Sequence, residues 1–139
     1  MTLPAVARSA HALVVDDDTA TSFMVQSMLE LMGLEVDVAS DGRMGADMAV
    51  SGDYALVMMD VEMPVMDGFD ATRSIRARAH EDVSGHINIV GMTGHTQDGI
   101  RRLGQQAGMD DLIVKPFLAD ALHARLKAIC GTSVRLDDI

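Results

Sequence analysis

The sequence has few of the residues that cross-link or stiffen a small protein. It contains one cysteine (Cys130), three prolines and no tryptophan, and aromatic residues make up 3% of its 139 residues. A single cysteine excludes an intramolecular disulfide and fits a reducing compartment, so we expect a cytoplasmic protein. With so few rings, the core has to be built from aliphatic residues and from the 12 methionines, whose unbranched side chains fill irregular gaps.

Basic residues and long apolar runs are also scarce. The chain has 11 Lys and Arg against 21 Asp and Glu, a formal net charge of −10. A nucleic-acid-binding protein normally presents a basic face, so we expect no nucleic-acid partner. No run approaches the roughly 18 apolar residues of a membrane span, and the first residues lack the basic region of a signal peptide. We therefore expect no membrane association.

The length of the chain predicts one domain. A chain of 139 residues can bury about two-thirds of its unfolded surface without the help of a disulfide or a structural metal. We expect an N-terminal extension over residues 1–9, a folded domain over residues 10–130 and a frayed tail over residues 131–139.

Short apolar runs alternate with segments of helical periodicity along the chain. The runs predict strands at His11–Val15, Glu35–Ser40, Tyr54–Asp60, Ile87–Thr93 and Asp111–Val114. Helices are predicted between and after them, on apolar stripes that include Met24, Val25, Met28, Leu29 and Met32; Asp41–Val50; Phe69, Thr72, Ile75 and Ala79; Ile100, Leu103 and Ala107; and Leu118, Leu122, Leu126 and Ile129. Five such units in series predict an α/β fold with a doubly wound parallel sheet of five strands. We expect the flavodoxin-like strand order 2-1-3-4-5.

Polar residues stand where four of the predicted strands end. Asp16 and Asp17 follow the first strand, Asp60 ends the third, Thr93 ends the fourth and Lys115 follows the fifth. In a parallel sheet, a site forms at the carboxyl ends of the strands near the point where the strand order reverses. With the order 2-1-3-4-5, these side chains would gather around one crevice.

Such a set of groups predicts phosphoryl chemistry with a metal ion. Clustered carboxylates repel one another, and hard oxygen ligands of this kind suit Mg²⁺. An aspartate can also act as a nucleophile toward phosphorus, while Mg²⁺ and Lys115 neutralise the phosphoryl oxygens and the Thr93 hydroxyl donates to one of them. The structural alternative is that the acidic run only caps the next helix. The presence of all four kinds of group at strand ends favours chemistry.

Four segments resemble the receiver domain of two-component response regulators. In order, they read "LVVDDD", "LVMMDVEMPVMDGFDATRSIR", "IVGMTGH" and "AGMDDLIVKPF". The resemblance covers nearly the whole chain, from about Ala10 to Ile129. The second and fourth segments are most similar to receivers of hybrid kinases and multistep phosphorelays.

The resemblance implies a role for each residue of the acidic crevice. Asp60 would be the phosphoacceptor, Asp17 a direct Mg²⁺ ligand with Asp16 beside it, and the main-chain carbonyl of Glu62 would complete the protein's share of the coordination shell. The phosphodonor would be a phosphohistidine on a sensor histidine kinase or a histidine phosphotransfer protein. The receiver would catalyse its own phosphorylation and later hydrolysis, without being a conventional enzyme, and would signal through a downstream protein target.

The resemblance also implies how the signal would be read, and here the sequence departs from the family. Thr93 would follow the phosphoryl group as the switch hydroxyl, and Lys115 would pair with it. The switch aromatic, three residues before that lysine, is replaced by Leu112, and the residue after Thr93 is Gly94 rather than the commoner Ala. We expect the helix over residues 100–107 to be the mobile output face.

Two other functions use similar residues. A phosphohydrolase of the haloacid dehalogenase type also has a nucleophilic Asp, Mg²⁺, Thr and Lys, but it needs Asp-x-Asp at the nucleophile, which Asp60-Val61-Glu62 only approximates. It also places its accessory acidic pair after the lysine, whereas Asp16 and Asp17 come first. The other alternative is a phosphate-independent pseudo-receiver that serves as a scaffold, against which the complete set of polar groups argues.

Overall fold

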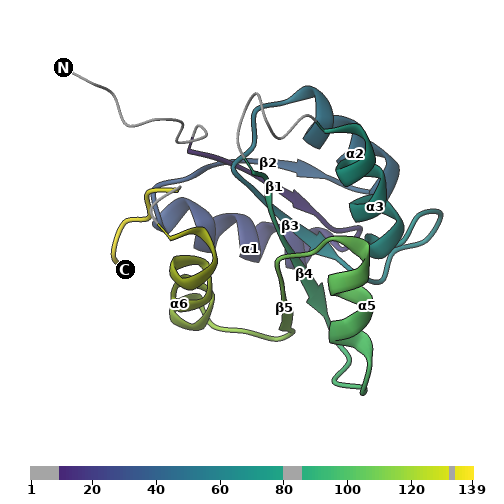
Figure 1. The fold of residues 1–139 in the computed structure, drawn as a ribbon. Helices are drawn as coiled ribbons and strands as arrows, with labels where there is room; N and C mark the ends of the chain where they lie inside the picture. Colours follow the sequence, from purple (N-terminus) through teal and green to yellow (C-terminus); the bar gives the residue numbers. More distant parts are fainter. Residues whose placement is uncertain (1–9, 80–85, 132–133) are drawn as a thin grey trace.

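A computed structural model of the chain describes residues 10–79, 86–131 and 134–139 and shows helices on both sides of a central sheet (Figure 1). Five strands and five helices alternate along the described residues: β1 His11–Val15, α1 Thr19–Leu31, β2 Glu35–Ala39, α2 Gly42–Ser51, β3 Leu56–Asp60, α3 Gly68–Arg78, β4 Asn88–Thr93, α5 Ile100–Ala107, β5 Asp111–Val114 and α6 Ala119–Cys130. The predicted α/β fold of five βα units is confirmed.

The five strands form one parallel sheet in the order β2-β1-β3-β4-β5. This is the flavodoxin-like order predicted from the sequence. Every residue of β3 and β4 is buried, as expected for strands that are covered on both faces. The edge strand β2 instead alternates between more and less exposed residues. The reversal of strand order lies between β1 and β3, at the site of the predicted crevice.

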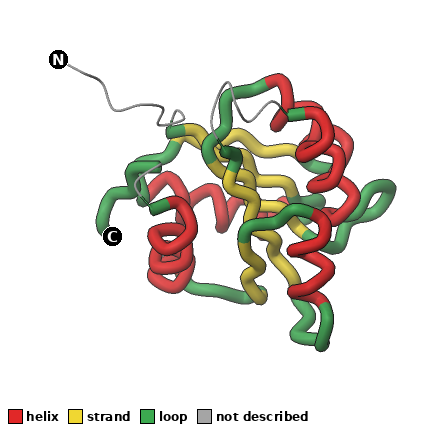
Figure 2. Tube along the Cα trace, viewed as in Figure 1, coloured by secondary structure: helices red, strands yellow, loops and turns green. Residues whose placement is uncertain are grey.

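The apolar core has two layers, one on each face of the sheet. Helices α1 and α6 cover one face, and α2, α3 and α5 cover the other (Figure 2). Because neighbouring residues of a strand point to opposite faces, Val14 packs with the α1 side while Leu13 and Val15 pack with the α2 side. Aliphatic side chains and methionines fill both layers, as the composition predicts.

Helix α1 is anchored along its length. The Asp18 side chain caps its start and accepts a 3.1 Å hydrogen bond from the Thr21 amide. Val25 and Leu29 are fully buried against the sheet, whereas Met24, expected on the same stripe, is 42% exposed. The buried apolar stripe of α1 therefore starts at Val25 and not at Met24.

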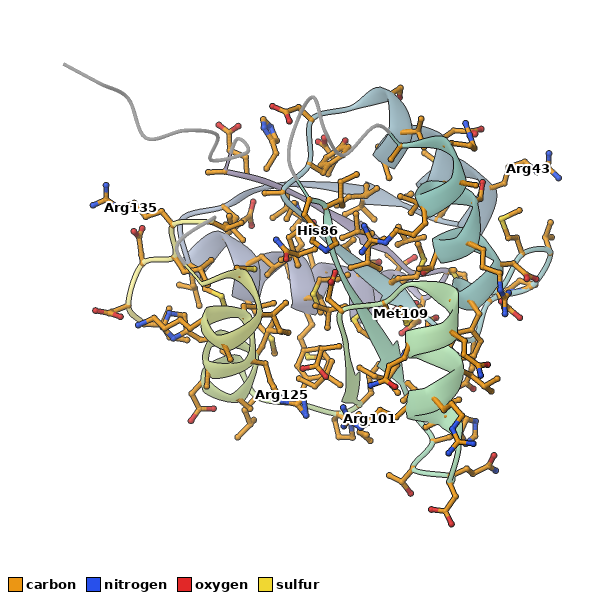
Figure 3. The ribbon with its side chains drawn as sticks, in the orientation of Figure 1. Arg43, His86, Arg101, Met109, Arg125 and Arg135 are labelled. Atoms are coloured by element: carbon orange, nitrogen blue, oxygen red, sulfur yellow. The ribbon has the colours of Figure 1, made fainter. Side chains whose placement is uncertain are left out.

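Helix α5 is shorter and faces the sheet with small residues. It starts after Gly99 and ends before Gly108, both in the left-handed region, and its buried residues are Gly104 and Ala107. Leu103 was predicted to lie on the buried face, but it is 45% exposed. The space under Gly104 is instead occupied by Met109 (Figure 3), whose sulfur would lie 3.3 Å from a Cβ added at that glycine.

Two arginines from opposite faces of the sheet meet the first residue of the edge strand β5. Arg101 of α5 and Arg125 of α6 each place a guanidinium nitrogen 3.0 Å from a different carboxylate oxygen of Asp111 (Figure 3). Leu118 was predicted on the apolar stripe of α6, but it precedes the helix as its N-cap residue and is 73% exposed. The α6 stripe starts at Leu122, which is fully buried.

The C-terminal segment packs against the domain. Val134 is 4% exposed and belongs to the core layer on the α1 side, and the Asp137 amide donates a 2.9 Å hydrogen bond to the Met32 carbonyl. The prediction of a frayed tail is therefore wrong for these residues. The predicted extension over residues 1–9 lies outside the described part of the chain. Among the described residues, no helix is long and apolar enough to cross a membrane.

Candidate functional site

Three aspartates meet where β1 and β3 end. Val15 and Met59 are paired neighbours in the sheet, so the residues that follow them, Asp16 and Asp60, reach the same edge. Asp16 is 2% exposed and Asp60 is 3% exposed, while Asp17 is open to solvent. One carboxylate oxygen from each of the three lies within 4.8 Å of the others. The structure thus brings together the acidic cluster that the strand ends predicted.

The Asp60 carboxyl is buried beside another negative charge. Burial, followed by the charge of Asp16, raises its pKa to about 6 from an ordinary value of 3.8, although Lys115 and the Glu62 amide act in the opposite direction. The Glu62 amide and the Lys115 ammonium both contact Oδ1 of Asp60, each at 3.3 Å. The resting site therefore holds more negative charge than its own residues neutralise.

Lys115 supplies the positive charge of the crevice. Its Nζ lies 3.3 Å from Asp60 Oδ1 and 3.7 Å from Asp16 Oδ2. Burial by itself would lower the pKa of this ammonium, but the two carboxylates outweigh it and the pKa is raised. The Lys115 amide also donates a 2.7 Å hydrogen bond to the Thr93 carbonyl, which fixes the end of β5 against the end of β4.

Thr93 lies at the end of β4, fully buried, with its hydroxyl engaged on two sides. Its Oγ1 accepts a 3.1 Å hydrogen bond from the His95 amide and donates to Glu62 Oε1 at 3.4 Å. The sequence placed the Glu62 side chain near the site but did not predict this contact with Thr93. The one available signal was a charged residue two positions after Asp60, which is too weak to predict a contact across two loops.

The β3–α3 loop is tightly fitted under the acidic cluster. A Cβ added at Gly68 would lie 2.2 Å from the main-chain oxygen of Asp60, so only glycine allows α3 to start this close to the site. Before it, the Met66 amide donates to the Pro64 carbonyl at 2.8 Å around Val65, which has a φ of 72°. Asp67 caps α3 by accepting from the Asp70 amide, as its position before the helix predicts.

Leu112 occupies the position where the resemblance implies an aromatic switch residue. It is a residue of β5, 2% exposed, paired with Gly91 of β4 and part of the core layer on the α2 side. A Cβ at Gly91 would lie 2.6 Å from Leu112 Cδ1 and 2.5 Å from Met109 Sδ, so the glycine of β4 makes room for both side chains. A cavity of about 300 Å³ adjoins this packing, and Leu112, Val114 and the β4–α5 loop line it.

The donor set of the crevice suits a hard divalent cation. Asp16 Oδ1 accepts a 2.9 Å hydrogen bond from the Asp18 amide, whereas its buried Oδ2 has no hydrogen-bond partner among the described residues. A buried carboxylate oxygen without a partner is costly unless a cation or water satisfies it. Three carboxylates in reach of one another supply the oxygen ligands that Mg²⁺ prefers.

Comparison with known families agrees with this geometry. The family model of the response regulator receiver domain matches residues 12–127. The chain belongs to this family. It is a signalling family rather than a class of conventional enzymes, and its acidic site is the one that phosphorelay proteins use to accept a phosphoryl group and to bind Mg²⁺.

Several individual receivers are similar to this chain. The sensor protein GacS of Pseudomonas syringae pv. syringae is 43% identical over 115 residues, which are 82% of this chain. The receiver domain of the sensor histidine kinase PA1611 from Pseudomonas aeruginosa PAO1, solved with magnesium in its active-site cleft, is 32% identical with a TM-score of 0.77, covering 88% of this chain and 98% of that one. The chemotaxis protein CheY4 of Vibrio cholerae is 30% identical with a TM-score of 0.77, covering 90% and 99%.

The similarity to sensor proteins concerns one part of much longer chains. The matched residues make up 13% of the length of GacS. In the comparisons with the PA1611 receiver domain and with CheY4, the matched residues make up nearly all of the other chain. The shared unit is therefore the receiver domain itself.

Proposed function

We propose that this receiver takes a phosphoryl group from a phosphohistidine onto Asp60 and signals by protein–protein contact. The observation that carries the proposal is the placement of the Asp60 carboxylate, 3% exposed at the centre of the crevice, with Lys115 Nζ 3.3 Å away and two further aspartates beside it. A nucleophile in such a setting has its charge partners in place before the phosphoryl group arrives.

The transfer uses groups that the chain already holds in position. Both hydrogen bonds that described residues give to the Asp60 side chain end on Oδ1, which leaves Oδ2 as the attacking atom. As the new P–O bond forms, the N–P bond of the phosphohistidine breaks, and its electron pair returns to the imidazole, which takes up a proton. Lys115 then neutralises a phosphoryl oxygen, and the Thr93 hydroxyl donates to another.

The metal site belongs to the same crevice. Asp17 and Asp60 are the residues that would bind Mg²⁺ directly, with Asp16 beside them and the Glu62 main-chain carbonyl as a further oxygen. The bound ion would neutralise charge on the phosphoryl oxygens. Asp16 Oδ2, which is buried and accepts no hydrogen bond from the described residues, and the exposed position of Asp17 support this assignment.

The partners follow from this chemistry. The donor would be a sensor histidine kinase or a histidine phosphotransfer protein, since a similar chain from Pseudomonas protegens is named a sensor histidine kinase. A downstream protein target would read the phosphorylated form. The receiver itself would promote the transfer and the later hydrolysis. The net charge of −10 argues against a nucleic-acid partner, and the single cysteine fits the cytoplasm.

The test is phosphorylation by acetyl phosphate with Mg²⁺, followed by intact-mass measurement. We expect one phosphoryl adduct per chain, absent in Asp60→Asn and retained in the matched control Asp67→Asn, because Asn caps a helix as well as Asp does. No adduct with intact folding would favour the scaffold. Rapid multiple turnover of phosphomonoesters would favour the hydrolase.

A further inference from the structure

The Glu62 carboxylate bridges the β3–α3 and β4–α5 loops at the mouth of the crevice. Its Oε1 accepts from the Thr93 hydroxyl at 3.4 Å and from the Gly94 amide at 3.3 Å. Its Oε2 lies 2.9 Å from His95 Nε2. A side chain that starts two residues after Asp60 thus collects the donors at the end of β4.

These donors are the kind that a phosphoryl group needs. An anionic oxygen binds best to hydroxyl and main-chain N–H donors held in position, and Thr93 is fully buried and fixed from behind by the His95 amide. A carboxylate and a phosphoryl group both present anionic oxygen atoms. The resting Glu62 therefore holds the donors with an oxygen of the same chemical class.

We propose that the Glu62 side chain is an internal competitor of the phosphoryl group, occupying the Thr93 and Gly94 donors until phosphorylation of Asp60 displaces it. This inference rests on the proposed function, since it concerns the state of the same site before and after transfer. Two anions cannot share one pair of donors at hydrogen-bond distance, because their charges repel.

The exposure of the side chains determines which group moves. The Glu62 and His95 side chains are 48% and 54% exposed, so either can turn into water at small cost. Thr93 is fully buried and cannot. Displacement would therefore release Glu62 outward, loosen its contact with His95 and leave the β4–α5 loop free to close on the phosphoryl group.

The first test is the affinity for beryllofluoride, a phosphoryl analogue, titrated with Mg²⁺ and followed by ¹⁹F NMR. We expect the apparent Kd to fall about three- to tenfold in Glu62→Ala, the range expected for one or two released hydrogen bonds. The gain should be smaller in Glu62→Gln, which keeps an acceptor but loses the charge. In a Thr93→Ala background most of the gain should disappear.

A matched control separates competition from a general effect of charge. Asp98 lies in the loop that carries His95 and lines the same cavity, so Asp98→Asn removes one negative charge nearby without touching the Glu62 contacts. Its Kd should stay within about twofold of the wild type. An equal gain in Asp98→Asn, or an unchanged or weaker affinity in Glu62→Ala, would overturn the proposal while leaving the phosphoacceptor function intact.

The second test needs no phosphoryl group. In ¹H–¹⁵N spectra of the resting protein, Glu62→Ala should shift the Gly94 amide resonance, which loses its acceptor, whereas Asp98→Asn should not. An unmoved Gly94 resonance would contradict the resting contact itself. If the wild type took up neither beryllofluoride nor a phosphoryl group, the proposed function would fail, and the competition would fail with it.

Discussion

Helices α1 and α5 both follow strands that deliver site residues, yet the chain holds them very differently. Helix α1 has 13 residues, an aspartate cap and fully buried Val25 and Leu29. Helix α5 has 8 residues, starts at a left-handed glycine without a side-chain cap and buries only Gly104 and Ala107. Little apolar area is lost from water along α5, so little free energy opposes its displacement. The helix next to Thr93 is the one that can respond.

Hydrogen exchange gives this contrast a measurable form. Amides of α1 should exchange only through global unfolding, whereas those of α5 should exchange through a local opening of lower free energy. Equal protection of the two helices would remove the basis for regarding α5 as the mobile output face.

The largest expected effect on the free energy of unfolding comes from truncating a buried side chain of α1. Leu29→Ala should lower the free energy of unfolding by about 3 kcal/mol, because the side chain is fully buried and leaves a cavity. Leu103→Ala on α5 removes the same atoms from a residue that is 45% exposed and should cost less than about 0.5 kcal/mol. Urea unfolding of both variants measures the difference, and similar costs would break the comparison.

A smaller effect concerns pH in the absence of Mg²⁺. The pKa of Asp60 in the folded protein is raised to about 6, so its contribution to stability is complete below about pH 4 and is lost as the pH rises through 6. Relative to Asp60→Asn, the wild type should lose roughly 1 to 2 kcal/mol over that range. Hydrogen exchange of the α1 amides should measure this loss, because these amides exchange only through global unfolding. If the free energy of unfolding of Asp60→Asn had the same pH dependence as that of the wild type, the prediction would be wrong.

Next in size is Gly99→Ala, at the start of α5. Gly99 has a φ of 90° and nothing within 4 Å of an added Cβ, so the substitution introduces backbone strain alone. We expect a loss of about 1 kcal/mol and faster exchange of the α5 amides. Unchanged exchange would mean that α5 does not depend on this left-handed start.

The smallest expected effect has the opposite sign. Gly104→Ala should stabilise α5 by about 0.5 kcal/mol, because alanine is the better helix former and Met109 is flexible enough to move from the 3.3 Å contact. The α5 amides should then exchange more slowly. Faster exchange would instead show that Met109 is rigidly fitted under the helix.

The sequence predicted the strands and the acidic crevice well, because both depend on signals carried by neighbouring residues. Apolar runs located all five strands, although the predicted ranges extend one or two residues beyond β2, β3 and β4. Once the strand order follows, residues at the strand ends have to converge. Asp60 could thus be placed beside Asp16, although residues 16 and 60 lie 44 positions apart in the chain.

Features that depend on packing between elements could not be predicted from the sequence. Leu103 carried the hydropathy signal of α5, but the face that meets Met109 is that of Gly104, a residue without such a signal. The same limit applies to the contact between Glu62 and Thr93 and to the packing of Val134, since each contact joins segments with no common periodicity. Leu118 fitted a helical stripe but lies before its helix.

The parallel register has a consequence for changes in chain length. Asp60 pairs with Met92, and Thr93 with Val114, so a single codon added inside β4 would move Thr93 out of line and send Val90 and Met92 to the wrong faces of the sheet. Exposed residues 96–98 are not part of a strand and carry no such constraint. In a library of single-codon insertions, codons 88–93 should therefore be depleted, whereas insertions at codons 96–98 should be tolerated.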